Sequence, residues 1–296
     1  IIKYIIFYYI YLRIEVLILS TKQKHIPCLI TIFGATGDLS HRKLFPSIFH
    51  LYQQDNLDEH IAIIGIGRRD YNNEQFRDQV KASIQTYVKD TDRIDEFMTH
   101  VFYHKTDVSD KDSYQSLLQF SERLDSEFAL GGNRLFYLAM APQFFGVISD
   151  YLKSSGLTQT KGFKRLVIEK PFGSDLKSAE SLNNQIRRSF KEEEIYRIDH
   201  YLGKDMVQNI EVLRFANAMF EPLWNNKYIS NIQVTSSEVL GVEDRGGYYE
   251  SSGALKDMVQ NHMLQMVALL AMEAPISLNS EDTVSYTHLR AHETPE

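Results

Sequence analysis

The sequence lacks the features that define several protein classes. It contains one cysteine, Cys28, which excludes an internal disulfide framework and a zinc site built from several cysteines. So low a cysteine content fits a reducing compartment, and we expect a cytoplasmic location. Basic residues are not in excess, since 32 Lys and Arg stand against 39 Asp and Glu. This balance argues against a nucleic-acid partner, because binding to phosphates needs a basic surface.

Long uncharged hydrophobic runs are lacking too. The first 20 residues look like a membrane anchor, but Lys3, Arg13 and Glu15 leave only nine uncharged residues in a row. A spanning helix needs about 20 predominantly apolar residues, and the cleavage site of a secretory signal is not evident. We expect residues 1–26 to be a non-native or disordered extension and predict no membrane partner. A true anchor or an extra packed element is the alternative.

The C-terminal end lacks a structural pattern. Residues 283–296 show no apolar periodicity, and we expect a foreign tail there. His288 and His292 have the spacing of two metal ligands on one helix face, but Pro295 follows and no third ligand is evident. We therefore predict no metal site.

Between these ends, short apolar runs alternate with amphipathic stretches. The expected strands are 28–33, 60–66, 101–104, 134–139 and 165–168, and the expected helices are 43–54, 73–88, 113–128 and 144–153. Strands of a parallel sheet are covered on both faces, so they form continuous apolar runs of this kind. The alternation predicts an α/β fold with a doubly wound, parallel, Rossmann-like sheet over residues 27–200.

The pattern changes beyond about residue 200. Helices are expected near 204–218 and 252–272, while 229–239 alternates between apolar and polar residues as a strand does. We expect residues 201–282 to be the start of an incomplete α+β domain with a mainly antiparallel sheet. A chain of 296 residues agrees with about two domains.

The loop after the first expected strand has the sequence GATGDLS, residues 34–40. Glycines such as Gly34 and Gly37 allow a tight turn and a close approach to a pyrophosphate, and the following helix start offers free N–H groups. The spacing is a variant of the dinucleotide-binding G-x-G-x-x-G pattern. An ordinary turn between a strand and a helix is the alternative.

The end of the second expected strand distinguishes between coenzymes. NAD sites place a carboxylate there for the ribose 2′-hydroxyl, whereas NADP sites place an arginine near the 2′-phosphate. Here Arg68 and Arg69 follow Gly67, and no carboxylate occurs before Asp70. The pair favours NADP, although one of the two could belong to a solvated basic turn.

Five ordered motifs are more specific. They are GATGDLSHRK (34–43), EKPFG (169–173), RIDHYLGKD (197–205), EVLGVEDR (238–245) and DMVQNH (257–262). Together they make residues 27–282 resemble the glucose-6-phosphate dehydrogenase family. The chain stops inside the second domain of that family. We therefore expect this truncated chain to be weakly active or inactive, and we expect the full-length protein to be a homodimer or homotetramer.

The resemblance implies an enzyme that oxidises D-glucose 6-phosphate at C1 to 6-phospho-D-glucono-1,5-lactone, with hydride transfer to NADP, as the first step of the oxidative pentose phosphate pathway. It also implies a catalytic base, His262, and an orienting acid, Asp199. The substrate-binding residues implied by the resemblance are His200, Tyr201, Lys204, Glu238, Asp257 and Lys170. The coenzyme-binding residues so implied are Gly34, Thr36, Gly37, Asp38, Leu39, Arg68, Asp107, Val108 and Lys170.

The side chains themselves allow both functional and structural interpretations. An imidazole suits a base that is neutral near pH 7, but a lone histidine on an apolar stripe, such as His262, is more often a packed core residue. A helix starting at His200 would place Lys204 on the same face. Asp257 and His262 are five residues apart, a spacing that does not put them on one narrow face of an α-helix.

Two other functions remain open. A Glu-Lys-Pro sequence after the fifth strand also occurs in the glucose–fructose oxidoreductase group, so another nicotinamide-dependent sugar oxidoreductase is one alternative. That group lacks RIDHYLGKD, which argues against it here. The other alternative is a fragment that binds the coenzyme without turnover.

Overall fold

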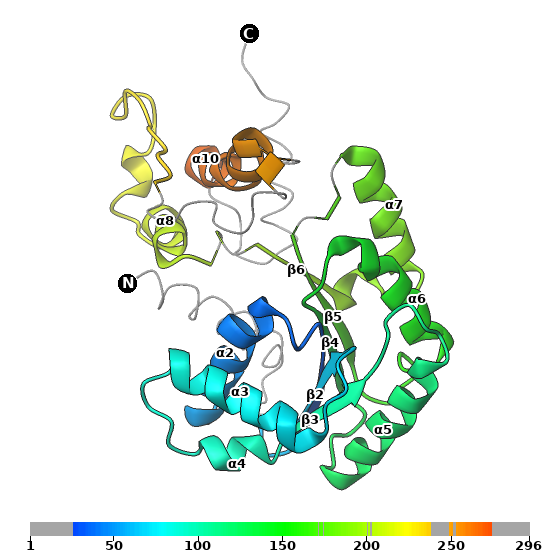
Figure 1. Ribbon diagram of the computed structural model, residues 1–296. Helices are drawn as coiled ribbons and strands as arrows, with labels where there is room; N and C mark the ends of the chain where they lie inside the picture. Colours follow the sequence, from blue (N-terminus) through cyan, green and yellow to red (C-terminus); the bar gives the residue numbers. More distant parts are fainter. Residues whose placement is uncertain are drawn as a thin grey trace. The chain divides into compact units, whose positions relative to one another are not determined.

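The computed structural model describes residues 26–170, 172–173, 175–199, 201, 203–237, 249–250 and 253–273. The chain divides into two units, the first ending at Asp199 and the second starting at His200 (Figure 1). The expected extension over 1–26 and the expected tail over 283–296 fall almost entirely outside the described residues and stay predictions. In the described ranges, no helix is long and apolar enough to cross a membrane.

The first unit is built on one parallel sheet of six strands in the order β3-β2-β1-β4-β5-β6. The strands are β1 (Cys28–Phe33), β2 (Ile61–Gly67), β3 (Val101–Lys105), β4 (Arg134–Leu138), β5 (Lys164–Glu169) and β6 (Ile195–Ile198). The doubly wound sheet is therefore confirmed, and the strand order reverses between β1 and β4, where such folds bind ligands. The edge strand β6 was not predicted, because Arg197 interrupts its short apolar run.

Helices cover both faces of this sheet (Figure 1). They are η1 (Ser40–Leu44), α2 (Phe45–Gln53), α3 (Asn73–Tyr87), α4 (Ile94–Met98), α5 (Ser113–Glu127), η2 (Pro142–Phe144), α6 (Phe145–Ser154), α7 (Leu176–Arg187) and η3 (Glu192–Glu194). The main predicted helices are present within a few residues of their expected ends. Two helices were not predicted: α4 has only five residues, and Ile186 is the one buried residue of α7.

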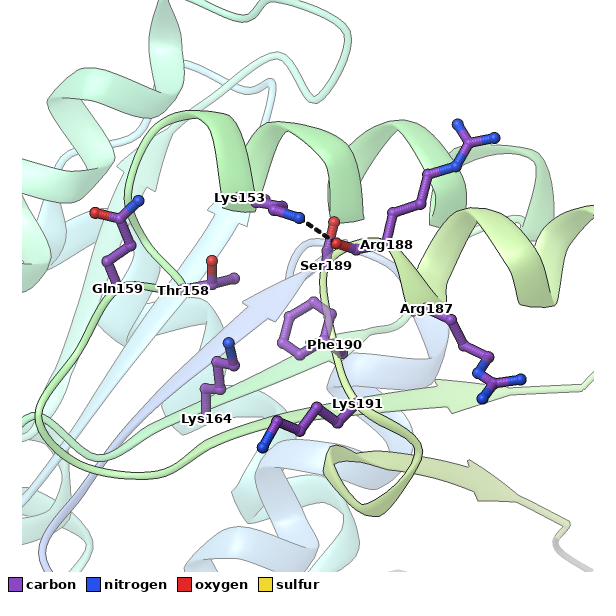
Figure 2. Close-up of a pocket in the computed structure, with 9 residues that line it drawn as sticks. All are labelled: Lys153, Thr158, Gln159, Lys164, Arg187, Arg188, Ser189, Phe190 and Lys191. Carbon is purple, nitrogen blue, oxygen red and sulfur yellow. Dashed lines mark hydrogen bonds between the residues drawn. The ribbon is translucent and has the colours of Figure 1, made fainter.

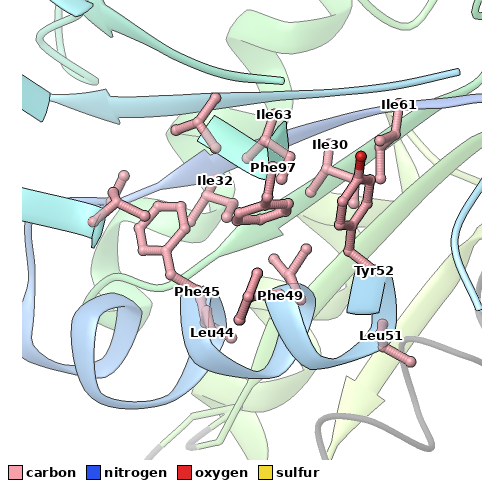
Figure 3. Close-up of a cluster of buried hydrophobic side chains, with 14 of the residues drawn as sticks. Ile30, Ile32, Leu44, Phe45, Phe49, Leu51, Tyr52, Ile61, Ile63 and Phe97 are labelled. Carbon is pink, nitrogen blue, oxygen red and sulfur yellow. The ribbon is translucent and has the colours of Figure 1, made fainter. Parts of the chain in front are cut away.

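Each face of the sheet has its own apolar core, since alternate residues of a strand point to opposite faces. Ile30 and Ile32 of β1 pack with aromatic residues of α2, α3 and α4, among them Phe45 and Phe97 (Figure 3). On the other face, Phe33 packs with residues of α5, α6 and α7. This double coverage explains why the strands are apolar throughout.

The described part of the second unit is helical. It contains α8 (Asp205–Phe215), η4 (Glu221–Leu223), η6 (Leu255–Met263) and α10 (Leu264–Ala271). Its apolar cluster joins α8 to α10 through Val207, Met266, Leu269 and Met272. Two side-chain bonds to carbonyls of α10 reinforce this packing, from Arg214 to Leu269 at 2.5 Å and from Trp224 to Leu270 at 2.8 Å.

Two expectations for this unit differ from the structure. Residues 229–237 form no strand, because a strand needs a neighbour for its backbone hydrogen bonds and the described residues of this unit provide none. The predicted helix near 204–218 begins at Asp205, with Lys204 as its N-cap and Tyr201 in the preceding turn. Lys204 therefore precedes the helix, and the expected pairing with His200 concerns a residue outside the described ranges.

Candidate active site

The loop after β1 is a tight turn that only glycine can begin. Gly34 has φ = 82°, and a Cβ there would lie 2.3 Å from the carbonyl oxygen of Ala139. The Gly34 carbonyl accepts hydrogen bonds from the Gly37 N–H and the Ser40 hydroxyl, both at 3.0 Å. These contacts hold the loop as a closed turn. A backbone cradle of this kind fits a dinucleotide pyrophosphate.

The helix start supplies the donors for such an anion. The first helical bond runs from the N–H of His41 to the carbonyl of Gly37 at 3.2 Å. The N–H groups of residues 38–40 precede that bond and so lack intrahelical acceptors. Asp38 is exposed, and Thr36 and Leu39 are half-buried, so all three predicted coenzyme residues lie around the mouth of the turn.

The two arginines after β2 differ in their contacts. Because Phe33 pairs with Ile66 in the sheet, Arg68 emerges at the same edge as the glycine turn. Among the described residues, the exposed Arg68 guanidinium makes no ion pair or hydrogen bond, whereas Arg69 donates to the Tyr71 hydroxyl at 3.2 Å. Burial, and then the charge of Arg69, lower the pKa of His41 at the start of the adjacent helix.

The predicted residues after β3 have structural contacts of their own. Asp107 accepts the Ser109 N–H at 2.9 Å in a turn that leads into α5. Val108 is 5% exposed and belongs to a core cluster, and its carbonyl accepts the Tyr114 hydroxyl at 3.1 Å. Their role at the edge of a coenzyme stays a prediction.

The carboxyl ends of β5 and β6 bring a lysine and an aspartate together. Glu169 pairs with Ile198 in the sheet, so Lys170 and Asp199 follow at neighbouring positions. The Lys170 ammonium donates to the Asp199 carboxylate, which is only 7% exposed. The pairing of Asp199 with His262, which lies in the other unit, stays a prediction.

A half-buried carboxyl next to this pair, that of Glu169, was not identified as a site residue from the sequence. The Tyr137 hydroxyl, at the end of β4, donates to the Glu169 carboxylate. Burial raises the pKa of Glu169, and the bond from Tyr137 partly opposes that effect. The available signal was the position of Tyr137 at the end of an apolar strand, where a buried hydroxyl needs a partner.

In the second unit, three of the predicted site residues, Lys204, Tyr201 and His262, form a stack. The ring of Tyr201 lies flat on the imidazole of His262, with centroids 3.9 Å apart and planes 13° apart. The Lys204 ammonium lies 3.6 Å from the centroid of the Tyr201 ring. Both rings are 4% exposed, and the Tyr201 hydroxyl is 3.4 Å from the Ser236 hydroxyl. Tyr201 thus fixes the plane of the His262 imidazole, and its ring also contacts the Lys204 ammonium.

The helix that contains His262 differs from the α-helix assumed for the spacing of Asp257 and His262. Residues Leu255–Met263 form a π-helix, in which residues five apart are hydrogen-bonded. Asp257 and His262 are therefore about one turn apart, which places them nearer to one face than an α-helix would. The separation expected from their spacing holds for an α-helix, whereas the helix formed here has a wider turn.

Two predicted substrate residues, His200 and Glu238, lie outside the described residues. In the part of the chain that is described, no group of three or more His, Cys, Asp or Glu residues could hold a metal ion. The described candidates form three sets, which are the glycine turn with Arg68, the Lys170–Asp199 pair, and the stack on His262.

Two family models match this chain. "Glucose-6-phosphate dehydrogenase, NAD binding domain" matches residues 31–209, and "Glucose-6-phosphate dehydrogenase, C-terminal domain" matches residues 211–289. The glucose-6-phosphate 1-dehydrogenase of Bacillus subtilis (strain 168) is 61% identical over 253 residues, which cover 86% of this chain and 51% of the relative. That of Streptococcus pneumoniae serotype 4 is 50% identical, with the same two coverages. The chain thus spans about half the length of these curated relatives.

Solved structures agree with this assignment. A glucose-6-phosphate dehydrogenase in complex with its substrate glucose-6-phosphate is 38% identical, with a TM-score of 0.82 over 90% of this chain and 56% of the other. The glucose-6-phosphate 1-dehydrogenase of Mycobacterium avium is 36% identical, with a TM-score of 0.75 over 88% of this chain and 56% of the other.

Proposed function

Because the chain belongs to the glucose-6-phosphate dehydrogenase family, we propose that it supplies the coenzyme site and the catalytic base of an enzyme that oxidises D-glucose 6-phosphate at C1. The observation that carries the proposal is the stack of Lys204, Tyr201 and His262. It joins a cation suited to a phosphate with an imidazole suited to a hydroxyl proton. One cluster could therefore hold and deprotonate a sugar phosphate.

The residues divide the chemistry as follows. His262 takes the proton of the C1 hydroxyl while the C1 hydrogen leaves as hydride, so that the C1–O bond becomes a carbonyl and the product is a lactone. The bound nicotinamide coenzyme supplies the hydride acceptor. Tyr201 keeps the imidazole in one plane, and Lys204 and His200 bind the phosphate. Asp257 and Glu238 accept hydrogen bonds from sugar hydroxyls.

The Lys170–Asp199 pair has a separate role in this proposal. Lys170 follows the strand that neighbours β4, so it lies at the carboxyl edge of the sheet, as the glycine turn does. Its ammonium can orient a substrate oxygen beside the coenzyme while Asp199 balances its charge. In the complete site, Asp199 would orient the imidazole of His262 and stabilise its protonated form.

The function is tested by following NADPH formation at 340 nm. The protein for this assay is a chimera that continues residues 27–282 of this chain with the second half of the Bacillus subtilis relative. We expect turnover with glucose 6-phosphate and little with unphosphorylated glucose. Equal rates with both sugars would favour another sugar oxidoreductase, and coenzyme binding without turnover would favour the binding-fragment alternative.

We also propose that the coenzyme is NADP, because Arg68 is exposed at the edge of the glycine turn and the described residues offer it no partner. A charge-assisted contact with the 2′-phosphate contributes about 1.5–3 kcal/mol. Arg68→Ala should therefore weaken NADP binding about 10- to 150-fold and leave NAD binding almost unchanged, as measured by fluorescence titration. Arg69→Ala is the matched control, since Arg69 already contacts Tyr71. Equal losses for the two coenzymes would refute the assignment.

A further inference from the structure

A pocket of the first unit is lined by cations (Figure 2). Its volume is about 280 Å³. The nine described residues that line it are Lys153, Thr158, Gln159, Lys164, Arg187, Arg188, Ser189, Phe190 and Lys191. They come from the C-terminal ends of α6 and α7, from the segment between α6 and β5, from the first residue of β5 and from the segment that leads to η3.

This pocket is separate from the coenzyme turn. Lys164 is the first residue of β5, whereas Gly34 and Arg68 follow the last residues of β1 and β2. Because all six strands are parallel, the two places lie at opposite edges of the sheet. The coenzyme of a doubly wound sheet binds at the carboxyl edge, so the cationic pocket at the amino edge needs a different ligand.

The positive charge of the pocket is only partly balanced. Five of the nine lining residues are Lys or Arg and none is acidic, while three carboxylates of η3 lie nearby, so the positive charge is in excess. Those carboxylates approach the pocket cations only to 3.7–3.9 Å: Glu192 at Arg187, Glu193 at Lys191 and Glu194 at Lys164.

Two of these carboxylates also have shorter contacts elsewhere. Glu192 accepts from the Arg197 guanidinium at 2.5 Å, and Glu194 accepts from the backbone N–H of Lys191 at 2.8 Å. The Arg188 side chain is exposed and makes no ion pair among the described residues. The pocket thus has cations that no neighbouring carboxylate fully neutralises.

A buried hydroxyl gives an independent indication of a ligand. Ser189 is 6% exposed, and its Oγ has no hydrogen-bond partner among the described residues. Buried polar atoms are nearly always hydrogen-bonded, so an orphan at a pocket wall points to an absent acceptor or donor. The Lys153 ammonium beside it already donates to the Arg188 carbonyl, so Lys153 helps to shape the wall (Figure 2).

We propose that this pocket binds a phosphate dianion, either free or as the phosphoryl group of a small metabolite. The negative charge of the dianion complements the excess positive charge, and the oxygens of phosphate accept from guanidinium, ammonium and hydroxyl donors alike. The volume is at the small end of ligand pockets, which disfavours a dinucleotide. The site is additional to the proposed dehydrogenase function and does not depend on it.

The test is isothermal titration of the 296-residue chain with inorganic phosphate at constant ionic strength. All proteins carry Arg68→Ala and Lys204→Ala, so that phosphate binding at the candidate active site does not contribute. The pocket variant adds Lys164→Gln and Arg188→Gln. The control variant adds Lys89→Gln and Lys111→Gln, two exposed lysines elsewhere on the unit, with the same change in net charge.

We expect the pocket variant to bind phosphate at least tenfold more weakly than the control. Ser189→Ala should also weaken binding, and because it removes an unpaired hydroxyl it should leave the fold intact, as judged by circular dichroism. Tighter binding of a sugar phosphate than of inorganic phosphate would identify a metabolite site, and equal binding would identify a site for the free ion. Equal phosphate affinities of the pocket and control variants, or no binding at all, would overturn the proposal.

Discussion

In the first unit, apolar side chains fill a core on each face of the sheet, whereas the described part of the second unit buries four apolar residues in its cluster. Twelve of the thirteen large apolar residues found exposed in the described ranges belong to the second unit. The free energy of folding scales with the apolar area removed from water. The first unit therefore stabilises itself, while the second unit gains little from the residues described.

The candidate sites differ in the same way. The coenzyme turn is made of backbone, and the N–H groups of Gly34 and Ala35 tie it to the Ile66 carbonyl of β2. The site of the second unit is a stack of side chains, in which Tyr201 lies between Lys204 and His262. The affinity for the coenzyme should therefore depend on the stability of the sheet. The catalytic rate should depend on individual side chains of the second unit.

The largest expected effect is that of His262→Asn, which should impair catalysis without impairing coenzyme binding. In the chimera, His262→Asn should lower kcat about 10²- to 10⁴-fold, because the reaction loses its general base. NADP affinity should stay unchanged, since the glycine turn lies in the first unit. Asp199→Asn should also lower kcat, through loss of the orienting acceptor. A His262→Asn variant with near-normal kcat would show that another group is the base.

Core substitutions test the stability comparison directly. Phe136→Ala on β4 should destabilise the first unit by about 3–5 kcal/mol, because Phe136 is fully buried against the helices of its face. Met266→Ala should lower the stability of the second unit by about 2 kcal/mol or less, since the small cluster around it can collapse into the space. Urea unfolding, followed separately in each unit, checks both values. A larger loss of unfolding free energy for Met266→Ala than for Phe136→Ala would contradict the idea that the first unit has the stronger core.

Lys204→Ala sharpens the assignment of the stack. It should raise KM for glucose 6-phosphate about 10- to 100-fold, because a charge-assisted contact with the phosphate is lost. NADP affinity, measured by fluorescence titration of the same protein, should not change. If coenzyme affinity fell while KM stayed constant, Lys204 would belong to the coenzyme site instead.

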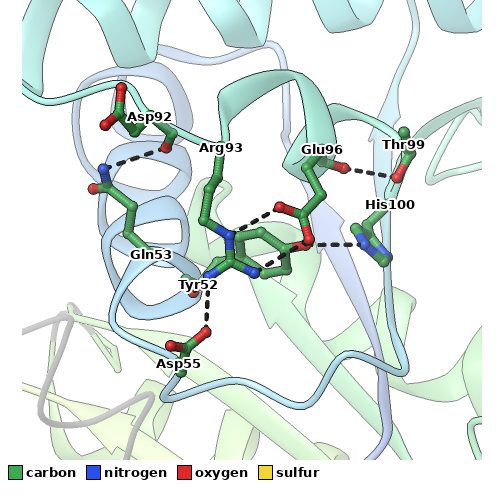
Figure 4. A network of polar contacts seen from close by, with 8 residues as sticks. All are labelled: Tyr52, Gln53, Asp55, Asp92, Arg93, Glu96, Thr99 and His100. Carbon is green, nitrogen blue, oxygen red and sulfur yellow. Dashed lines mark hydrogen bonds and ion pairs between the residues drawn. The ribbon is translucent and has the colours of Figure 1, made fainter.

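The smallest expected effect is on the pH dependence of the stability of the first unit. Bonds from Arg93 and Tyr52 lower the pKa of Glu96 to about 2, in a network that joins α2 to α4 (Figure 4). A carboxyl whose pKa is lower in the folded state stabilises the fold above its ordinary pKa of about 4.3, and this contribution is lost as the pH falls toward 2.

Glu96→Gln should therefore flatten the loss of Tm between about pH 4.5 and 2 while leaving its slope above pH 5 unchanged. The control is Glu127→Gln, which changes an exposed carboxyl that has no ion pair within the described ranges. Differential scanning calorimetry at several pH values provides the measurement. If both variants kept the parent's slope, the network would contribute nothing to acid stability.

Much of the fold could be predicted because its signals are local. The five main strands are apolar runs of the length and composition of buried strands, and Gly34–Ser40 is a contiguous turn whose conformation depends on its own glycines. Short elements were missed where the local signal is weak, as in β6 with its arginine and in α7 with its single buried residue. The strand expected at 229–239 was wrong within the described residues, because alternation alone does not supply a pairing partner.

Local sequence patterns were enough to predict five of the six strands, the main helices of the first unit, the glycine turn and the chemical types of the site residues, since each depends on neighbouring residues in the chain. Which of those residues meet depends on how the elements pack. Lys170 reaches Asp199 because β5 and β6 are neighbours in the sheet, and Asp257 lies about one turn from His262 because their helix is wound as a π-helix. Sheet register and helix winding are set by packing between distant segments, which no local pattern encodes.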